Sequence, residues 1–382
     1  MTEGFFVKIL YVSPAVFPSY KASLIQVLNT CIGFHDANYD ITLYAGRKPG
    51  KTSWSQEINE FYGVEADFRK KSFKAKSNRF ANIFSYILGL CKVLLNDFYD
   101  VVYTRSFPMF FICILFNKKS IFEVHDFPNK RKLFIFKLIF KIFNSKNLFI
   151  ASPSKSLLRY YKLRANISCN TLWVPHGSSH NRKSSQFNCY SGALDDLMKS
   201  ESGGISLAYV GSIGRGKGYD FLVKVANKMP HIKFNVSLMC DSEEIKEDIR
   251  SAAPRNVNIE FNLDRNGVLE IYKKSSVLLL PVAKYTGKGG SSKLTRQLAP
   301  LRAYEYLAAE KPIICSCIWP NREVFKKNGP ALFLPIDESL WVEAINYLNS
   351  NRLVLKKMSQ DSAYLNKEFS WEQRAKTIVS AL

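Results

Sequence analysis

The feature that most constrains the fold is the alternation of short apolar runs with longer segments of helical periodicity. The run "VKILYVS" at 7–13 is continuous and rich in β-branched residues, as in strands that are buried on both faces. In the first half, strands are expected at 7–13, 40–46, 100–106, 120–126, 148–152 and 171–177. Strands that alternate with helices pair in parallel, so the sequence predicts a doubly wound α/β sheet.

The second half repeats this alternation after a polar segment. Residues 178–204 are rich in Ser and Gly and less periodic, which predicts a domain boundary. Strands are then expected at 206–213, 232–239, 257–261, 276–281, 312–316 and 331–334, with helices at 219–229, 242–252, 264–274 and 301–309 and a helical tail from about 338 to 382. Two domains suit a chain of 382 residues. Ligands of such sheets bind beyond the carboxyl ends of the strands, so we expect a cleft between the domains.

Charge and cysteine usage narrow the class of partner and the compartment. The formal net charge is +22, and residues 69–165 hold 20 Lys and Arg against four Asp and Glu, which indicates an anionic partner for the N-terminal half. The eight cysteines are scattered without a CxxC pair, so we expect buried thiols of a cytosolic protein. The first residues read as a strand rather than a signal peptide. The longest apolar stretch, 107–116, falls short of the roughly 20 residues that span a bilayer.

A glycine-rich turn opens the second series of strands and helices. In "AYVGSIGRGKGYDFLVKVA" (208–226), an apolar strand runs into four glycines and then a helix. Glycines let the backbone approach a phosphate, a helix N-terminus favours anions, and Arg215 and Lys217 add two cations suited to a diphosphate. The pattern fits neither a Walker loop nor a clean dinucleotide fingerprint. The alternative is an ordinary βα turn with two solvated cations.

A glutamate stands within an otherwise apolar helix in "PLRAYEYLAAEKPIICS" (300–316). An unpaired buried charge is costly, so Glu305 needs a partner. One hypothesis is a ribose diol, which a carboxylate is shaped to hold. The alternative is an ion pair with the nearby Arg302. The preceding segment, 283–299, is rich in Gly, Lys and Ser and reads as a loop beside a ligand site.

The order of these motifs resembles a known enzyme family. The "VG…KG" turn, "PLRAYEYLAAEKPIICS" and "FSWEQRA" follow one another, preceded by "SPAVFPSYKASLIQVLNTC", "YDVVYTRS", "FEVHDFP" and "VPHG". Together they resemble the retaining glycosyltransferases of family 4, which have the GT-B fold of two facing Rossmann-like domains. The resemblance covers nearly the whole chain and rests on the order of the motifs rather than on any one of them.

The resemblance implies a role for each matching residue. Lys217, with Arg215, would bind the donor's diphosphate and stabilise charge on the leaving group, and His125 would contact the donor sugar near the reacting carbon. The alternative for His125 is a structural histidine at a strand end. The nucleotide-binding set would comprise Gly211, Ser212, Gly214, Gly216, Gly218, Gln297, Leu301, Arg302 and Glu305, and the acceptor-side loop Ser19, Lys21 and Ser23. The resemblance implies no metal and no cofactor besides the nucleotide sugar, and no DxD-type carboxylate pair is present.

Three departures from the family pattern are visible. Ser212 stands where the family usually has an arginine, and Gln297 stands where the family has a second glutamate. The N-terminal loop reads "PSYKAS" in place of a glycine pair. Arg215 is a candidate substitute for the missing arginine, and the missing glutamate leaves the choice of sugar open.

Two segments of the N-terminal half combine basic and aromatic residues. In 127–149, Lys130, Lys137 and Lys141 form a helical stripe among Phe, Leu and Ile, and "RKKSFKAKSNRF" lies upstream at 69–80. The segment 80–96 has an amphipathic pattern, with polar or small residues at Asn82, Ser85, Gly89, Lys92 and Asn96. We expect an anionic membrane surface to bind Lys130, Arg131, Lys132, Lys137 and Lys141. The alternatives are a core helix with a solvated lysine face and, less favoured for want of a module signature, nucleic acid.

The sequence therefore predicts a cytoplasmic glycosyltransferase held at the inner face of the plasma membrane. Its donor would be a nucleotide-diphosphate sugar and its acceptor a lipid-linked or growing bacterial surface glycan. Residues 1–180 would bind the acceptor and face the membrane, residues 200–364 would bind the donor, and residues 365–382 would form a helix that crosses back. The rival hypotheses are a nucleotide-sugar epimerase or hydrolase of the same fold, which Gln297 disfavours, and a non-catalytic membrane scaffold.

Overall fold

The computed structural model describes residues 7–19, 22–47, 52–74, 78–143, 145–163, 170–178, 204–214, 217–282, 301–326 and 329–382. The chain divides into two compact units. Unit 1 comprises Met1–Gly177 and Ser370–Leu382, and unit 2 comprises Ser178–Phe369. The C-terminal segment therefore belongs to the same unit as the N-terminal segment.

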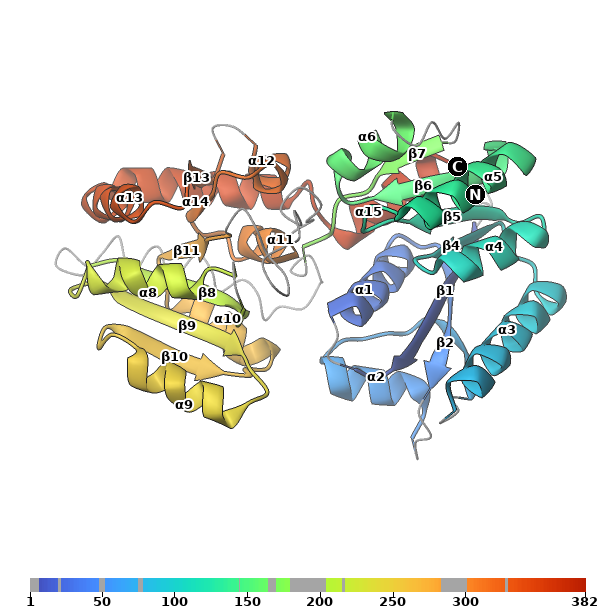
Figure 1. Ribbon diagram of the computed structural model, residues 1–382, viewed down its shortest axis with the longest axis horizontal. Coiled ribbons are helices and arrows are strands. Elements are labelled where there is room, and N and C mark those ends of the chain that lie inside the picture. Colours follow the sequence, from blue (N-terminus) through green and yellow to red (C-terminus); the bar gives the residue numbers. More distant parts are fainter. Residues whose placement is uncertain are drawn as a thin grey trace, which may run out of the picture. The chain divides into compact units, whose positions relative to one another are not determined.

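Unit 1 contains a parallel sheet of seven strands in the order β3-β2-β1-β4-β5-β6-β7 (Figure 1). The strands are β1 (Lys8–Phe17), β2 (Asp40–Arg47), β3 (Arg69–Lys74), β4 (Val101–Thr104), β5 (Lys119–Glu123), β6 (Leu148–Ser152) and β7 (Asn170–Trp173). The helices are α1 (Ala22–Asp36), α2 (Trp54–Tyr62), α3 (Arg79–Asn96), α4 (Phe107–Leu115), α5 (Lys130–Ile142), α6 (Lys155–Leu163) and α15 (Trp371–Ser380), with a 3-10 turn η1 (Ser145–Asn147). The strand order reverses between β1 and β4, which makes the carboxyl ends of these two strands the switch point of the sheet.

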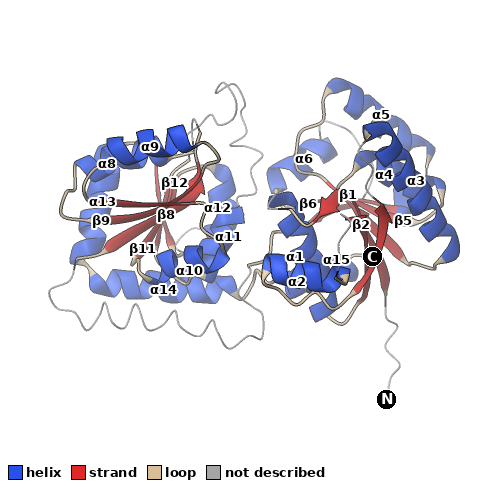
Figure 2. Ribbon diagram, turned by 90° about the horizontal axis from the view of Figure 1, so that it is seen from below, coloured by secondary structure: helices blue, strands red, loops and turns tan. Residues whose placement is uncertain are grey.

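The helices of unit 1 cover both faces of the sheet (Figure 2). One apolar core lies between the sheet and α1, α2 and α15, and two others lie between the opposite face and α3 to α6. α15 packs tightly on α1, because a Cβ added at Gly33 would lie 2.3 Å from the Trp371 carbonyl oxygen. Because the strand order reverses at the switch point, the crossovers on its two sides place their helices on opposite faces of the sheet.

Unit 2 contains a second parallel sheet, of six strands in the order β10-β9-β8-β11-β12-β13. The strands are β8 (Ser206–Ser212), β9 (Lys233–Met239), β10 (Val257–Phe261), β11 (Val277–Leu280), β12 (Ile313–Ser316) and β13 (Ala331–Leu334). The helices are α8 (Tyr219–Asn227), α9 (Glu243–Ala252), α10 (Arg265–Lys273), α11 (Leu301–Ala308), α12 (Trp319–Phe325), α13 (Glu338–Ser350) and α14 (Arg352–Asn366). α8 and α13 pack on one face around the buried Trp341, and β8 and β11 flank the switch point.

Most strands expected from the sequence are present, and the prediction of two doubly wound α/β domains is confirmed. β1 is longer than expected, because it continues past a register shift between Val12 and Val16. The sequence reading did not assign five elements: α2, β3, α4, α6 and α12. β3 was hidden by its composition, since "RKKSFK" carries four cations and only Phe73 is buried in it. An edge strand of this kind lacks the apolar run by which the central strands were recognised.

Candidate functional site

The glycine-rich turn of unit 2 lies between the carboxyl end of β8 and the start of α8. Gly218 is the residue before α8 and has a φ of 103°, a conformation that residues with a side chain rarely adopt. A Cβ at Gly218 would lie 2.3 Å from the Pro281 carbonyl oxygen. The turn is therefore pressed against the chain that follows β11. Arg215 and Gly216, two of the predicted phosphate-binding residues, lie outside the described residues.

Two cations lie near this turn and repel each other. Lys217 is half-buried, and its pKa is lowered by burial and by the positive charge of Arg302. Arg302 donates from one guanidinium nitrogen to the Val210 carbonyl oxygen at 2.6 Å, and its guanidinium carbon lies 5.5 Å from the centre of the Tyr209 ring. The Tyr209 hydroxyl donates in turn to the Lys217 carbonyl oxygen. A pair of cations held this way suits an anion, which would relieve their repulsion.

Glu305 lies on α11, near the same edge of the sheet. Burial raises the pKa of its carboxyl group, although the charges of Arg302 and Arg265 oppose the shift. Within the described part of the chain, no hydrogen bond or ion pair reaches the Glu305 carboxylate, and Arg302 is bonded to the Val210 carbonyl instead. The expected alternative, an ion pair between Glu305 and Arg302, is therefore not formed. A half-buried carboxylate of this kind is available to a ligand with hydroxyl donors.

The remaining donor-side residues are distributed around this turn. Gly211 is buried at the end of β8, where an added Cβ would lie 2.4 Å from the Tyr209 hydroxyl oxygen. Ser212 is the last residue of β8 and half-buried, Gly214 is exposed, and Leu301 is the half-buried first residue of α11. Gln297 and the segment 283–300 lie outside the described residues. The predicted donor-binding residues that are described therefore lie along one edge of the unit 2 sheet.

In unit 1, His125 follows the carboxyl end of β5. Its side chain is 22% exposed, and its Nε2 lies 3.1 Å from the Glu123 Oε1. The ring stacks at 6.2 Å on that of His176, whose pKa is held well below its usual range by burial and by the nearby charge of Arg374. His125 thus has one nitrogen turned towards a carboxylate and part of its ring open to solvent.

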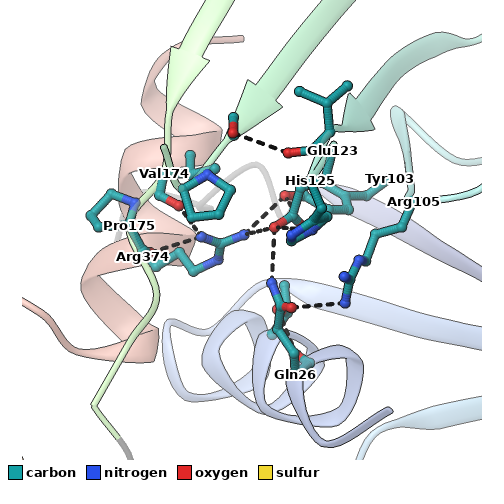
Figure 3. A network of polar contacts seen from close by, with 12 residues as sticks. Gln26, Tyr103, Arg105, Glu123, His125, Val174, Pro175 and Arg374 are labelled. Carbon is teal, nitrogen blue, oxygen red and sulfur yellow. Dashed lines mark hydrogen bonds and ion pairs between the residues drawn. The ribbon is translucent and has the colours of Figure 1, made fainter. Parts of the chain in front are cut away.

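Glu123 is the centre of a buried polar network that the sequence reading did not assign (Figure 3). Its Oε1 accepts from the Gln26 Nε2 and from an Arg374 guanidinium nitrogen, both at 2.9 Å. Its Oε2 accepts from the Tyr103 hydroxyl at 2.7 Å. The ion pair between Glu123 and Arg374 is almost fully buried. The signal was present in the sequence, because a carboxylate in the apolar run "SIFEVHD" needs a partner as much as Glu305 does.

Arg374 joins this network to the end of the strand series. It belongs to α15, and it also donates to the carbonyl oxygens of Val174 and Pro175, the latter at 2.7 Å. Its pKa is raised: burial alone would lower it, but the nearby Glu123 carboxylate stabilises its charge. The C-terminal helix therefore supplies the cation that neutralises a buried carboxylate on β5.

Arg105 is a second residue that the sequence reading missed, at the switch point of the unit 1 sheet. It follows β4, is half-buried, and donates to the Gln26 Oε1 at 2.7 Å and to the Ser23 carbonyl oxygen at 3.2 Å. Ser23 and Ser19 were predicted on the acceptor side. The side chain of Ser23 is exposed, and the backbone N–H and carbonyl of Ser19 both bond the Tyr62 hydroxyl. Lys21, the third predicted acceptor-side residue, lies outside the described residues.

The helix expected at 80–96 is present as α3, which buries Tyr86, Leu90, Val93 and Leu94 against the sheet. Ser85 and Gly89 are half-buried, and a Cβ at Gly89 would lie 2.2 Å from the Tyr44 hydroxyl oxygen. Tyr44 and Tyr86 fill the space beneath, with ring centroids 5.5 Å apart. Five further large apolar side chains of α3 are exposed, namely Phe80, Ile83, Phe84, Leu88 and Leu95. α3 therefore carries large apolar side chains on its exposed side as well as on the side that packs against the sheet, which is unusual for an amphipathic helix.

α4 and α5 continue this surface, and α3, α4 and α5 lie on the same face of the sheet (Figure 2). Phe111 and Leu115 of α4 are exposed, as are Phe134, Ile135, Leu138 and Ile142 of α5. The five predicted membrane-binding residues Lys130, Arg131, Lys132, Lys137 and Lys141 are all exposed on α5. We call the exposed apolar and basic residues of α3, α4 and α5 the outer helix surface. Its combination of cations and large apolar side chains is typical of membrane-surface helices.

Two features are absent from the described residues, a membrane-spanning helix and a cluster of metal ligands. None of their helices is both long and apolar enough to cross a bilayer. In the same set, no cluster of three or more His, Cys, Asp or Glu side chains is arranged to hold a metal ion. The six described cysteines are free thiols, and Cys317 alone among them is exposed.

Comparison with known proteins gives the following similarities. Residues 199–364 match the sequence model of the family described as glycosyl transferases group 1. No curated protein matches the chain. A solved structure of a glycosyltransferase from Rickettsia africae ESF-5 is similar with a TM-score of 0.68 and 14% identity, covering 98% of this chain and 97% of that one.

Two further solved structures contain nucleotides. Anabaena Alr3699/HepE in complex with UDP-glucose is similar with a TM-score of 0.64 and 11% identity, covering 98% of this chain and 100% of that one. S. aureus MnaA in complex with UDP is similar with a TM-score of 0.53 and 13% identity, covering 98% and 95%. At these identities the likeness shows the fold, two Rossmann-like units of the GT-B type.

Proposed function

We propose that this chain, whose residues 199–364 carry a glycosyl transferases group 1 domain, is a glycosyltransferase that uses a nucleotide-diphosphate sugar as donor. The observation that carries the proposal is the site on unit 2. Three features lie along one edge of its sheet. They are Gly218, which has no room for a side chain, the mutually repelling cations Lys217 and Arg302, and the Glu305 carboxylate, which has no partner among the described residues. The similar solved structures with UDP-glucose and UDP support the same class of ligand.

The diphosphate and the ribose of such a donor match the cations and the carboxylate of this site. Lys217, with Arg215, would bind the diphosphate, because an anion offsets both the burial of Lys217 and its repulsion by Arg302. Glu305 would accept hydrogen bonds from the two hydroxyls of the ribose. Burial raises the pKa of Glu305, and hydrogen-bond donors supplied by a ribose would stabilise its charged form.

The proposed reaction transfers the sugar with retention at the anomeric carbon. The bond from this carbon to the diphosphate oxygen breaks, and a bond to an acceptor hydroxyl forms on the same face of the sugar. The acceptor's proton passes to the leaving diphosphate, whose negative charge Lys217 stabilises. His125 would contact the donor sugar near the reacting carbon. We propose no metal and no further cofactor for this step.

The proposed acceptor is a lipid-linked or growing bacterial surface glycan at the inner face of the plasma membrane. The outer helix surface supports this choice, because it combines the exposed lysines of α5 with exposed Phe, Leu and Ile of α3, α4 and α5. Cations attract anionic headgroups, and apolar side chains enter the acyl boundary. A lipid surface suits both features together, whereas a solvated lysine face would account for the lysines alone.

The test of the donor site is thermal unfolding of the full chain with UDP, GDP, ADP and CMP. A ligand that binds only the folded state stabilises it by about 2.7 kcal/mol at a concentration of 100 Kd. For a unit of this size, such a gain raises Tm by roughly 5 °C or more. We expect a shift of this order with one nucleoside diphosphate and its loss in Glu305→Gln.

A matched control is available just beyond the same helix. Glu310 follows the other end of α11, and burial raises its pKa as it does that of Glu305. Glu310→Gln should therefore keep the nucleotide-dependent shift, since Glu310 lies away from the carboxyl edge of the sheet. If no nucleotide raises Tm, the ribose role of Glu305 is wrong and a non-catalytic scaffold becomes the better hypothesis.

A further inference from the structure

An arginine of unit 1 keeps part of its hydrogen-bonding capacity unused at the carboxyl edge of the sheet. Arg105 follows β4, one of the two strands that flank the switch point, where doubly wound sheets bind ligands. Its Nη1 donates to the Gln26 Oε1 at 2.7 Å and to the Ser23 carbonyl oxygen at 3.2 Å. Within the described part of the chain, Nε and Nη2 have no acceptor, and no carboxylate forms an ion pair with Arg105. This half-buried guanidinium therefore has N–H groups available to a ligand.

The buried network holds Arg105 in place and leaves its charge uncompensated (Figure 3). The Glu123 Oε1 accepts from the Gln26 Nε2 at 2.9 Å, so the amide oxygen of Gln26 is turned towards Arg105. The Glu123 carboxylate is already neutralised by Arg374 in an almost fully buried ion pair. Asp126, the next carboxylate along the chain, is exposed and forms no ion pair with any described residue. Two arginines and one buried carboxylate leave a surplus positive charge, which an anion would neutralise.

Two further features favour an anion at this place. Burial, followed by the charge of Arg374, holds the pKa of His176 well below its usual range, and the charge of Arg105 acts in the same direction. α4 begins at Phe107, two residues after Arg105, and its capping residue Ser106 makes no side-chain hydrogen bond. The first N–H groups of α4 and the partial positive charge of its N-terminus are therefore available beside Arg105. Phosphate groups are typical ligands of such a helix start.

The helix that begins beside Arg105 leads into the outer helix surface. Phe111 and Leu115 of α4 are exposed, and they lie about 6 and 12 Å along the helix from Phe107. The basic first turn of α5 is exposed as well, and it follows the carboxyl end of the neighbouring strand β5. An apolar chain attached to a phosphate at Arg105 could therefore extend over exposed apolar side chains towards a membrane. This continuity favours a phosphate carried by a lipid over a free phosphate.

We propose that Arg105 binds the phosphate group through which a lipid carrier is joined to the acceptor glycan. The inference rests on the proposed function, because the acceptor proposed there is lipid-linked, and it concerns unit 1 alone. The free edge of the guanidinium, with Nε and Nη2, would bind two phosphate oxygens at once. Glu123 and Gln26 touch no substrate in this arrangement. They act through Arg105, whose Nη1 they hold.

The competing explanation is a purely structural arginine that ties the start of α1 to the end of β4 through the Ser23 carbonyl oxygen. Both explanations predict that replacing Arg105 lowers Tm. They differ in ligand binding, because a structural arginine would leave the affinity of the folded protein for a lipid phosphate unchanged.

The test is isothermal titration calorimetry of the full chain with geranyl diphosphate, a soluble lipid diphosphate. Geraniol, which lacks the phosphates, and inorganic pyrophosphate, which lacks the lipid, are titrated beside it. We expect the tightest binding for geranyl diphosphate. Hydrogen bonds to charged groups are strong enough that its Kd should rise by about tenfold or more in Arg105→Gln.

A second variant keeps the test decisive if Arg105→Gln does not fold. Arg105→Lys retains the charge but loses the planar fork, so the Kd for geranyl diphosphate should rise by about threefold. The matched control is Arg159→Gln on α6, which replaces an exposed arginine of the same unit. This control should bind geranyl diphosphate as the wild type does.

Nucleotide binding distinguishes this inference from the proposed function. Arg105→Gln should keep the nucleotide-dependent Tm shift, and Glu305→Gln should keep the affinity for geranyl diphosphate, because the two residues belong to different units. The inference is overturned if both Arg105 variants bind geranyl diphosphate as the wild type does, or if geraniol binds equally well. Equally tight binding of pyrophosphate would overturn the assignment to a lipid. Absence of any nucleotide-dependent shift would overturn the proposed donor site instead, while weaker binding of geranyl diphosphate by Arg105→Gln would still support the phosphate site of unit 1.

Discussion

Replacing two phenylalanines of α3 tests the outer helix surface most directly. Phe80 and Phe84 are 82% and 65% exposed and stand one helical turn apart. The double variant Phe80→Ser/Phe84→Ser removes both rings without touching a buried residue. Because neither ring is part of an apolar core, the free energy of unfolding should change by less than about 0.5 kcal/mol.

The expected loss of membrane binding follows from the exposed area. A phenylalanine side chain offers about 200 Å² when fully buried, so the exposed parts of the two rings amount to roughly 300 Å². At about 25 cal/mol per Å² this area is worth about 7 kcal/mol if both rings leave water completely. A helix lying in the interface buries about half of such a surface, which leaves about 3 kcal/mol. The partition coefficient should therefore fall by a factor of roughly one hundred or more.

The assay is sedimentation of the full chain with vesicles that contain 30% or so of an anionic phospholipid, a composition that exploits the attraction of about 1 kcal/mol per lysine near the surface. The matched control is Leu353→Ser/Tyr364→Ser on α14, where the two side chains are 79% and 71% exposed. These residues lie in unit 2, outside the outer helix surface, so the control should bind vesicles as the wild type does.

Equal binding of the wild type and the Phe80→Ser/Phe84→Ser variant would refute the reasoning about α3. A second outcome is that binding is lost with neutral vesicles and at high salt but is unchanged when the two phenylalanines are replaced. This result would mean that the lysines of α5 bind the vesicles without help from α3. A loss of the same size in the α14 control would show that any exposed apolar pair suffices, and the proposed surface would then have no special role.

Three further predictions concern stability and are checked by urea unfolding. Gly218→Ala should lower the free energy of unfolding by about 3 kcal/mol or more and abolish nucleotide binding, because a φ of 103° is unfavourable for alanine and its Cβ would clash with the Pro281 carbonyl. The control Gly63→Ala has a φ of 60° and open space around it, so it should lower the free energy of unfolding by only about 1 kcal/mol. Equal losses in the two variants would contradict the close approach to Pro281. Lys311→Met should stabilise the chain by about 3 kcal/mol at pH 7, because burial lowers the pKa of Lys311 from 10.5 to about 8. Between pH 8 and 10.5 the unfolded chain therefore binds more protons than the folded chain. The wild type should then gain stability relative to Lys311→Met as the pH rises through this window. A difference in the free energy of unfolding that stays constant with pH would disprove the lowered pKa of Lys311.

Much of the fold could be predicted from the sequence, because its central strands carry their own signal. Strands buried on both faces are continuous apolar runs, and "VKILYVS" and "SVLLLP" could be recognised without any partner. The elements that were missed are those whose sequence is ambiguous in isolation. β3 is a basic edge strand, and α4 was noted only as an apolar stretch whose length excluded a membrane span.

The residues proposed for the donor side of the candidate site were also singled out from the sequence. Gly218, Lys217 and Glu305 are residues whose types are unusual for their positions, and such departures indicate a functional or strained site. The sequence could not show which group each charged side chain contacts. Arg302 stands three residues before Glu305 on the same helix, a spacing that favours an ion pair, yet its guanidinium is bonded to the Val210 carbonyl of β8.

By itself the sequence determined the class of the fold, the order of its strands and helices, and the residue types available for an anionic donor. Periodicity and turn chemistry are local, so they can be read one segment at a time. Only the tertiary structure decided which way α3 faces, since this depends on Tyr44 beneath Gly89. Only the tertiary structure joined Glu123 to Arg374, 251 residues later, because a buried charge selects its partner by distance in space and not by position in the chain.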